Sequence, residues 1–171
     1  SYHQLGRIAE ERHNFDTAEN WHRKSLAISE KHSNEADIAI SYHQLGRIAE
    51  QRRDFSAAEI WHQKSLVISE KIGDRYGTAG SYHQLGMIAQ ERRDFDAAER
   101  WYRKALVIFE KLGDDHAAIT YHQMGRISEE RGNLDAAEGW YRKSLEISEK
   151  LGIEHGAAIT YHQLGRIAQK R

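Results

Sequence analysis

The sequence predicts an all-α fold built from a repeated pair of helices, and three observations support this prediction. The motif SYHQLGRIAE occupies residues 1–10 and returns unchanged at residues 41–50. Proline is absent from all 171 residues, as expected of helices joined by short turns. Apolar residues recur at three- and four-residue spacing, which is the pattern of an amphipathic helix. The repeat therefore sets the architecture, and each element follows from it.

The first helix of each repeat, named helix A, contains the motif Y-H-Q-L/M-G. In the second copy, Leu45, Ile48 and Ala49 join Tyr42 in one apolar stripe, which is expected to face the core. An arginine near the end of each helix A suits the negative end of the helix dipole and needs no partner there. The motif starts at Tyr2, Tyr42, Tyr82, Tyr121 and Tyr161. The arginines are Arg12, Arg52, Arg92 and Arg131.

The second helix, named helix B, begins with an acidic or hydroxyl residue followed three positions later by glutamate, which is the pattern of a capping box. We expect it to start near residues 16, 56, 96 and 135. A glycine is expected to end it, because glycine adopts positive φ without a side-chain penalty, and the first copy has Ser33, a poorer stop. The capping pairs are Asp16/Glu19, Ser56/Glu59, Asp96/Glu99 and Asp135/Glu138. The glycines are Gly73, Gly113 and Gly152.

The repeats are expected to form a continuous stack, because neither helix can bury its apolar face alone. We expect nine helices in a single array over residues 1–171, with repeats at 1–40, 41–80, 81–119 and 120–159 and a half repeat at 160–171. On the last helix, Leu164 and Ile167 are expected to be partly exposed. This exposure predicts end-to-end self-association of the chain.

Composition excludes several classes of partner. Lysine and arginine number 25 and aspartate and glutamate 26, so the chain lacks the basic excess that favours nucleic acid. It has neither an apolar run of membrane-spanning length nor a signal-peptide pattern. Cysteine is absent, which suits a reducing compartment. We therefore expect a cytoplasmic protein with no nucleic-acid or membrane partner.

The motifs resemble the tetratricopeptide repeat (TPR), whose signature is W-x2-L-G-x2-Y, then A-x3-F, then P. Tyr82, Leu85 and Gly86 fall on W, L and G. The A-x3-F position holds Tyr102 in the third copy but His22 in the first. It also holds Tyr141 in the fourth copy and His62 in the second. The glycine between the helices survives only as Gly132, and glutamate replaces the proline, so helix B is expected to run on.

The resemblance implies a right-handed superhelical solenoid of antiparallel helix pairs, with about four and a half repeats. The 40-residue period exceeds the usual one of about 34 and is similar to the Leu-Gly-Asn-repeat scaffolds of G-protein signalling and to prokaryotic signalling-ATPase sensor arrays. In such proteins the A helices line the concave surface. The resemblance therefore implies a protein-binding scaffold whose groove is lined by helix A residues that face away from the core.

The expected groove starts at the residue after each tyrosine and steps four and then three positions along helix A. Arginine there offers a planar fork of donors that fits carboxylates. The resemblance implies an extended or helical peptide of acidic character as the ligand. Met87 makes a local apolar spot. Ala39, Ala79, Ala118 and Ala158 lie one turn earlier and are expected to leave room for the ligand. The groove residues are His3, Arg7, His43, Arg47, Glu50, His83, Met87, Gln90, His122, Arg126, Glu129, His162 and Arg166.

Two other interpretations of this surface stay open. Arginine and glutamate one turn apart on the same helix could simply neutralise each other on a solvated face. The near-identity of the copies also fits a structural or engineered consensus array without a natural ligand. Variation at the arginine position discriminates between binding and these alternatives, and Met87 is the one residue that departs.

The histidine row does not predict a metal site, because zinc needs ligands at about 2 Å and neighbouring helices stand roughly 10 Å apart. The histidines either pack and donate hydrogen bonds, or respond to pH; the second hypothesis predicts tighter binding of an acidic peptide at about pH 5.5 than at about 7.5. A tryptophan recurs on each helix B, at Trp21, Trp61, Trp101 and Trp140, and is expected to be structural.

The sequence does not predict an enzyme. It has no nucleophile paired with a base and no glycine-rich phosphate loop, and its serines fall on packing positions. An active site is a single constellation, whereas nearly every feature here recurs in each repeat. We therefore expect no catalytic residues, cofactor or metal.

Overall fold

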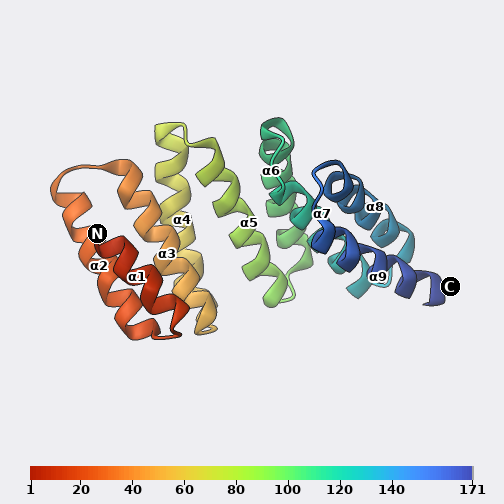
Figure 1. Cartoon of the computed structure of the whole chain (residues 1–171), viewed down its shortest axis with the longest axis horizontal. Helices are drawn as coiled ribbons and strands as arrows, with labels where there is room; N and C mark the ends of the chain where they lie inside the picture. The colour runs from red at the N-terminus through yellow and green to blue at the C-terminus, as the bar shows by residue number, and fades with distance from the viewer. Residues whose placement is uncertain (171) are drawn as a thin grey trace. The chain divides into compact units, whose positions relative to one another are not determined.

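The computed structural model describes residues 1–170, which form nine α-helices joined by short turns (Figure 1). The A helices are α1 (Tyr2–Glu11), α3 (Glu35–Gln51), α5 (Arg75–Glu91), α7 (His116–Glu130) and α9 (Glu154–Lys170). The B helices are α2 (Phe15–Lys31), α4 (Phe55–Ile72), α6 (Phe95–Leu112) and α8 (Leu134–Lys150). The predicted alternation of A and B helices is confirmed over these residues.

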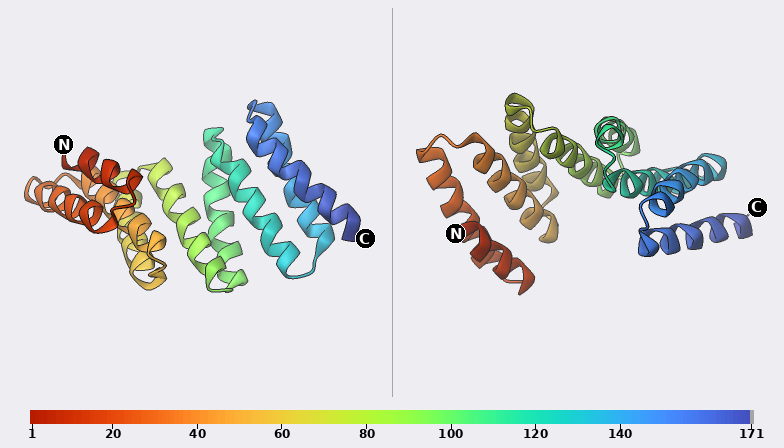
Figure 2. Two further views of the ribbon diagram at one scale, coloured as in Figure 1. Left: turned by 60° about the horizontal axis from the view of Figure 1, so that its bottom comes forward. Right: turned by 45° about the horizontal axis from the view of Figure 1, so that its top comes forward.

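The helices group into two compact units. Unit 1 covers residues 1–88, with α1 to α4 and most of α5; unit 2 begins at residue 89, with the last turn of α5 and α6 to α9. Within each unit, consecutive helices pack against each other as antiparallel pairs (Figure 2). No helix within residues 1–170 has both the length and the hydropathy needed to cross a membrane.

Helix B begins one residue earlier than expected and has a different cap. Asn14 Oδ1 accepts a hydrogen bond from the Thr17 backbone N–H at 3.2 Å, and Asp54 Oδ1 accepts from Ala57 at 3.0 Å. Asp94 and Asn133 cap α6 and α8 in the same way. The prediction that Asp16, Ser56, Asp96 and Asp135 are the capping residues is therefore wrong. Each lies one residue inside the helix, so its own backbone is already helical.

One residue in each turn adopts positive φ. Between helices A and B this residue is His13, Arg53, Arg93 or Gly132, with φ of 55°, 60°, 61° and 75°. Between helices B and A it is Ser33, Gly73, Gly113 or Gly152, with φ of 53°, 73°, 63° and 69°. The predicted glycine stops are confirmed. Positive φ strains any residue with a Cβ, so four of these eight turns hold a strained residue.

The glycine of the Y-H-Q-L/M-G motif lets helix A touch the ring on helix B. A Cβ on Gly46 would lie 2.6 Å from the His62 ring, and one on Gly125 would lie 2.5 Å from the Tyr141 ring. Both rings are fully buried. The ring packed on the glycine therefore sets the spacing between the two helices of a repeat.

An isoleucine on each following helix A joins one repeat to the next. Ile48 packs with Ala9 and Ala18 of the preceding repeat, and Ile167 packs with Ala137 and Tyr141. Ile167 is 1% exposed, so the expectation that it would be partly exposed is wrong. It lies on the same stripe as Ile48, which faces the preceding repeat. Leu164 is half-buried against the same cluster.

Helix B runs on past the position of the missing proline, as expected. The glutamate at that position accepts a hydrogen bond from the hydroxyl of the tyrosine that opens the Y-H-Q-L/M-G motif of the next helix A. This bond joins Tyr42 to Glu30 at 3.4 Å and Tyr82 to Glu70 at 2.5 Å, and also joins Tyr121 to Glu110 and Tyr161 to Glu149. Partial burial, together with the hydrogen bond to the Glu70 carboxylate, raises the pKa of Tyr82 to about 12.

Candidate functional site

The predicted groove residues lie on the A helices and differ in exposure according to their position in the row. The first position, held by histidine, is buried in His83 and half-buried in His3, His43 and His122. The second position, held by arginine or methionine, is exposed in Arg7, Arg126 and Arg166 and half-buried in Arg47 and Met87. The third position is buried or half-buried in Glu10, Glu50, Gln90 and Glu129. His162, by contrast, is exposed.

The histidines of helix A pack edge-on or tilted against the buried ring of helix B. The ring centroids of His43 and His62 are 5.1 Å apart, and those of His122 and Tyr141 are also 5.1 Å apart. Burial, together with the nearby His62 and Arg47, lowers the pKa of His43 to about 3. The hypothesis that this row charges on mild acidification is therefore wrong at His43, and the packing interpretation holds there.

The side chain at the third position of the row forms a hydrogen bond with the buried ring of helix B. His22 Nε2 lies 2.8 Å from Glu10 Oε1, and His62 Nε2 lies 2.6 Å from Glu50 Oε1. Tyr102 donates its hydroxyl proton to Gln90 Oε1 at 2.9 Å. Tyr141 donates to Glu129 at 3.2 Å. These glutamates and this glutamine are thus engaged inside each repeat.

The arginines differ in whether an acid faces them. Arg47 pairs with Glu10 at 3.8 Å, and Arg166 pairs with Glu129 at 3.2 Å. In both pairs the acid lies on the preceding helix A, so the interpretation of neutralisation one turn along the same helix is wrong. Among residues 1–170, no carboxylate lies within ion-pair distance of Arg126, whose guanidinium donates to Gln123 Oε1 at 3.2 Å. Arg126 is therefore available to an anion.

Three exposed isoleucines lie beside the predicted row but were not among its predicted residues. Ala39, Ala79 and Ala118 are buried, so the expectation that they leave room for a ligand is wrong for these three; Ala158 is exposed. A residue four positions before the histidine lies about 40° around the helix from it, on the side of the core. A residue three positions before the histidine lies about 60° around the helix in the opposite direction. The residues three back are Ile40, Gly80, Ile119 and Ile159. The three isoleucines are 41–48% exposed.

In unit 2, helices α7 and α9 lie side by side (Figure 2). Two hollows are lined by residues of these helices. The apolar hollow has a volume of about 190 Å³ and includes Ile119, Ile153 and Ile159, with Ser144 and Ser148 of α8. The charged hollow has a volume of about 360 Å³. Its lining residues are Arg126, Glu129, Glu130, Gln163, Arg166 and Lys170.

A family model for the tetratricopeptide repeat matches residues 1–71, 77–150 and 116–171. The chain belongs to the tetratricopeptide repeat family. The matched TPR model describes a repeat module that is itself non-catalytic and that generally binds proteins or peptides. No curated protein matches the sequence.

Solved structures share the TPR fold at low sequence identity. BtubC from P. vanneervenii matches with a TM-score of 0.76 and 18% identity over 97% of this chain and 78% of its own. A putative kinesin light chain of Podosopora anserina, with nearly identical TPR-like repeats, gives 0.79 and 18% over 98% and 84%. The apo form of RapI gives 0.87 and 18% over 93% of this chain, which spans 58% of RapI. At this identity the likeness shows the fold.

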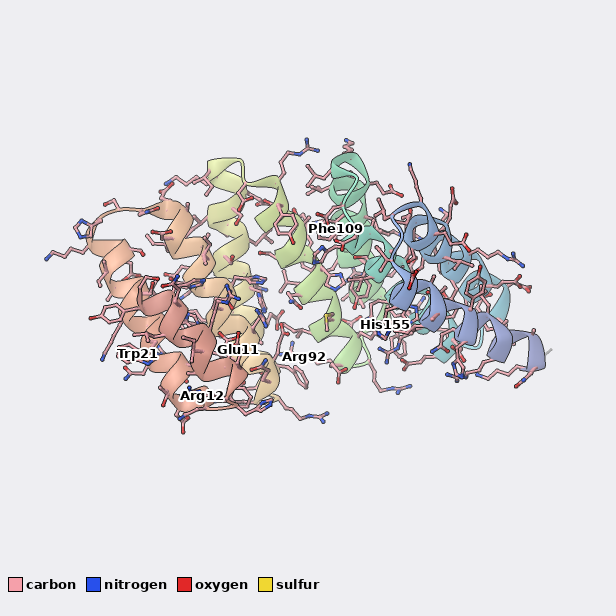
Figure 3. The ribbon with its side chains drawn as sticks, viewed as in Figure 1. Glu11, Arg12, Trp21, Arg92, Phe109 and His155 are labelled. Carbon is pink, nitrogen blue, oxygen red and sulfur yellow. The ribbon has the colours of Figure 1, made fainter. Side chains whose placement is uncertain are left out.

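The tryptophans of the TPR helices B pack between neighbours, as expected of structural residues. Trp21, which is labelled in Figure 3, stacks on Tyr2 with ring centroids 5.3 Å apart. Trp61 stacks on Tyr42 at 5.6 Å, and the Arg23 guanidinium of the preceding helix B lies 5.4 Å from its centroid. Trp61 and Trp140 thus join their own repeats to the preceding ones, through Arg23 and Arg103.

Two of the arginines that end the TPR helices A pair with carboxylates of the preceding helix B. Arg52 lies 2.6 Å from Asp16 and 2.6 Å from Glu19 of the preceding helix B. Arg131 pairs with Asp96, and it lies 3.5 Å from Glu99. The expectation that these arginines need no partner is wrong for Arg52 and Arg131. The guanidinium forks of Arg52 and Arg131 each bind two carboxylates of the preceding repeat.

Within residues 1–170, the side chains close enough together to hold a metal ion lie outside the histidine row. Asp114, Asp115 and His116 place one ligand atom each within 4.8 Å of one another in the turn before α7. His116 Nδ1 lies 2.7 Å from Asp114 and 3.0 Å from Asp115. The imidazole also stacks on Phe109 of α6, with ring centroids 5.4 Å apart. Together these contacts anchor the start of α7.

Proposed function

We propose that this TPR chain is a protein-interaction module that binds an acidic peptide segment along the exposed faces of its A helices. The observation that supports this most directly is Arg126, an exposed guanidinium that has no carboxylate partner among the described residues 1–170. Arg166 and Lys170 line the same hollow. A planar donor fork at such a position suits a carboxylate of the ligand.

The groove residues differ in the part they take in this proposal. Arg7 and Arg126 are exposed cations that a ligand can reach directly. Arg47 and Arg166 would first have to break their ion pairs with Glu10 and Glu129. His3, His43 and His122 shape the surface as packed rings whose pKa is lowered by burial, and His83 is buried. The charge balance of the chain argues against nucleic acid, and the absence of cysteine suits the cytoplasm.

One observation favours the alternative of a structural array without a natural ligand. Arg47 and Arg166 are already paired with glutamates of the preceding repeat, and Glu50 is engaged with His62. Much of the predicted row is therefore satisfied within the chain. An array of this kind would bind no peptide through Arg126.

The test compares two matched arginines. The probe is a fluorescein-labelled decapeptide, GSGDGSDGSG, with GSGNGSNGSG as its uncharged counterpart, and binding is measured by fluorescence anisotropy. Arg126→Gln should weaken binding of the aspartate probe roughly fivefold or more, since it removes a charge-assisted hydrogen bond. Arg47→Gln should change it less, because Arg47 is already paired. Equal affinity for the two probes, or no binding of either, would favour the array without a ligand.

We also propose that the 171-residue chain associates end to end through α1. Tyr2, Leu5 and Ile8 are 39%, 42% and 45% exposed, whereas Leu45 and Ile48, their counterparts on α3, are 2% and 1% exposed. The exposed face of α1 thus has the composition of a face that is buried in the next repeat. Tyr161 on α9 of a second copy is 56% exposed and supplies an apolar surface to meet it.

A further inference from the structure

The two hollows of unit 2 lie in a fixed order along α7 and α9. The apolar hollow contains Ile119 of α7 and Ile159 of α9, and the charged hollow contains Arg126 of α7 and Arg166 of α9. The same order on both helices means that α7 and α9 run in the same direction. An extended ligand that lies between them therefore passes from the apolar hollow to the charged one.

The spacing of the hollows fixes the spacing of ligand groups. Ile119 and Arg126 are seven residues apart on one helix, which corresponds to about 10 Å at 1.5 Å per residue. An extended chain in the polyproline II conformation advances about 3.1 Å per residue and has three residues per turn, so side chains three positions apart lie on the same face. Two side chains three positions apart in an extended peptide therefore reach both hollows.

The apolar hollow suits one aliphatic side chain. Its isoleucine walls are exposed, with Ile119 at 48% and Ile159 at 41%. The polar groups at its floor have partners within the chain: Thr160 Oγ1 donates to the Gly156 carbonyl at 2.9 Å and lies 3.4 Å from Ser144 Oγ. A side chain seated there would remove apolar surface from water without stripping these hydroxyls of a partner.

The charged hollow suits an acidic side chain. Glu129 is occupied by Arg166 at 3.2 Å, Lys170 at 2.6 Å and the Tyr141 hydroxyl at 3.2 Å. Glu130 lies 3.6 Å from Arg93. Three cations thus line the hollow against two engaged carboxylates, and Arg126 has no carboxylate partner in residues 1–170. The excess positive charge favours an anion at this end of the path.

We propose that unit 2 binds an extended peptide segment in which an aliphatic residue and an acidic residue are separated by two positions. This rests on the proposed function and adds to it a second, apolar subsite and a spacing. Unit 1 does not repeat the combination. Ile40 is followed on the next helix A by Gly80 in place of an isoleucine, and Arg47 is paired with Glu10.

The probes vary one feature of the peptide at a time. Each is a decapeptide with leucine and aspartate separated by two residues, made in both orders, GSGLGSDGSG and GSGDGSLGSG. One control replaces leucine with alanine, and another places leucine and aspartate next to each other. Binding is followed by anisotropy and by NMR of the isoleucine methyl groups, which separates Ile119 and Ile159 from Ile40.

One order of the spaced probe should shift the methyl signals of Ile119 and Ile159. Replacing its leucine with alanine should weaken binding about tenfold, as loss of a buried aliphatic side chain does. Ile159→Ala should weaken binding of the leucine probe and leave the alanine probe unchanged. Ile40→Ala, an equally exposed isoleucine of unit 1, is the matched control and should have no effect. Thermal unfolding monitored by circular dichroism checks that each variant is folded.

Failure of the subsite is distinguishable from failure of the proposed function. If leucine and alanine probes bind equally while Arg126→Gln still weakens both, acidic-peptide binding stands and the apolar subsite is overturned. If the adjacent probe binds as well as the spaced one, the spacing is overturned. If no probe binds and no isoleucine methyl signal shifts, both proposals are overturned.

Discussion

At the scale of single residues, the environment of His43 makes stability depend on pH. Its imidazole packs on His62 and lies near Arg47, while Glu50 is held by His62. The pKa is about 3 in the folded chain and 6.5 in the unfolded one. Below pH 6.5 the unfolded chain therefore binds a proton that the folded chain does not, and folding weakens as pH falls. Above pH 6.5 the effect is absent.

We expect the free energy of unfolding to fall by about 1.4 kcal/mol per pH unit through this group, or about 2 kcal/mol between pH 6.5 and 5. Urea unfolding at several pH values measures the slope. His43→Gln should remove this part of the slope, whatever its effect on stability at pH 7.5. His155→Gln, at an exposed site, should leave the slope as it is. An unchanged slope in His43→Gln would contradict the assignment.

Gly46 gives a second residue-scale prediction. Gly46→Ala places a methyl group 2.6 Å from the buried His62 ring, so the two helices must separate or the ring must move. We expect a loss of about 2 kcal/mol in chemical denaturation. Gly139→Ala on α8 has open space around it and should instead stabilise the helix by about 0.5 kcal/mol or more. Equal effects of the two substitutions would show that the ring contact does not limit helix spacing.

At the scale of elements, the turns offer a stabilising substitution. Arg53 has φ of 60°, and Gly132 occupies the equivalent turn with φ of 75°. Arg53→Gly should raise the free energy of unfolding by about 1 kcal/mol, because glycine relieves the strain at positive φ. Gly132→Ala should lower it by about the same amount. Urea denaturation measures both, and a destabilised Arg53→Gly would mean that the arginine side chain contributes more than the strain.

The elements themselves were predictable because their signal is repeated and local. Helical spacing and the absence of proline predicted every helix within residues 1–170, and the glycine stops were placed correctly. The caps were not, because each helix B offers two candidate acceptors two positions apart, such as Asn14 and Asp16. Both fit the side-chain chemistry of a cap. The backbone conformation around them decides, and the sequence does not contain it.

The candidate site was predictable in outline, because helix geometry places every third or fourth residue on one face. What sequence could not supply was the direction of each side chain between helices. Glu50 faces its own helix B, and Arg47 reaches back to Glu10. Ile119 and Ile159 could have been found from the sequence, because each stands three residues before the histidine of its motif. The predicted row instead used the residue four positions before the histidine, so it did not include these exposed isoleucines.

At the scale of the whole molecule, repetition makes one repeat a control for another. His22 and His62 occupy in unit 1 the buried position that Tyr102 and Tyr141 occupy in unit 2, and each has its own partner on helix A. The backbone plan is kept while the buried ring changes. The division of the chain into one array of four and a half repeats stays a prediction, since it concerns how the repeats act together.

Self-association is the property of the whole molecule that the exposed face of α1 predicts. Contact with a second copy would remove the apolar side chains of Leu5 and Ile8 from water. The equivalent side chains of the next repeat, Leu45 and Ile48, are already buried within the chain. We expect sedimentation equilibrium of the 171-residue chain to give a mass that rises with concentration. Leu5→Glu combined with Ile8→Glu should return it to a monomer. Val67→Glu changes a residue that is 64% exposed on α4 and should not. If both variants dissociate alike, the association is non-specific and does not depend on α1. If the wild-type chain stays monomeric at high concentration, the exposed face of α1 is not a site of contact between copies.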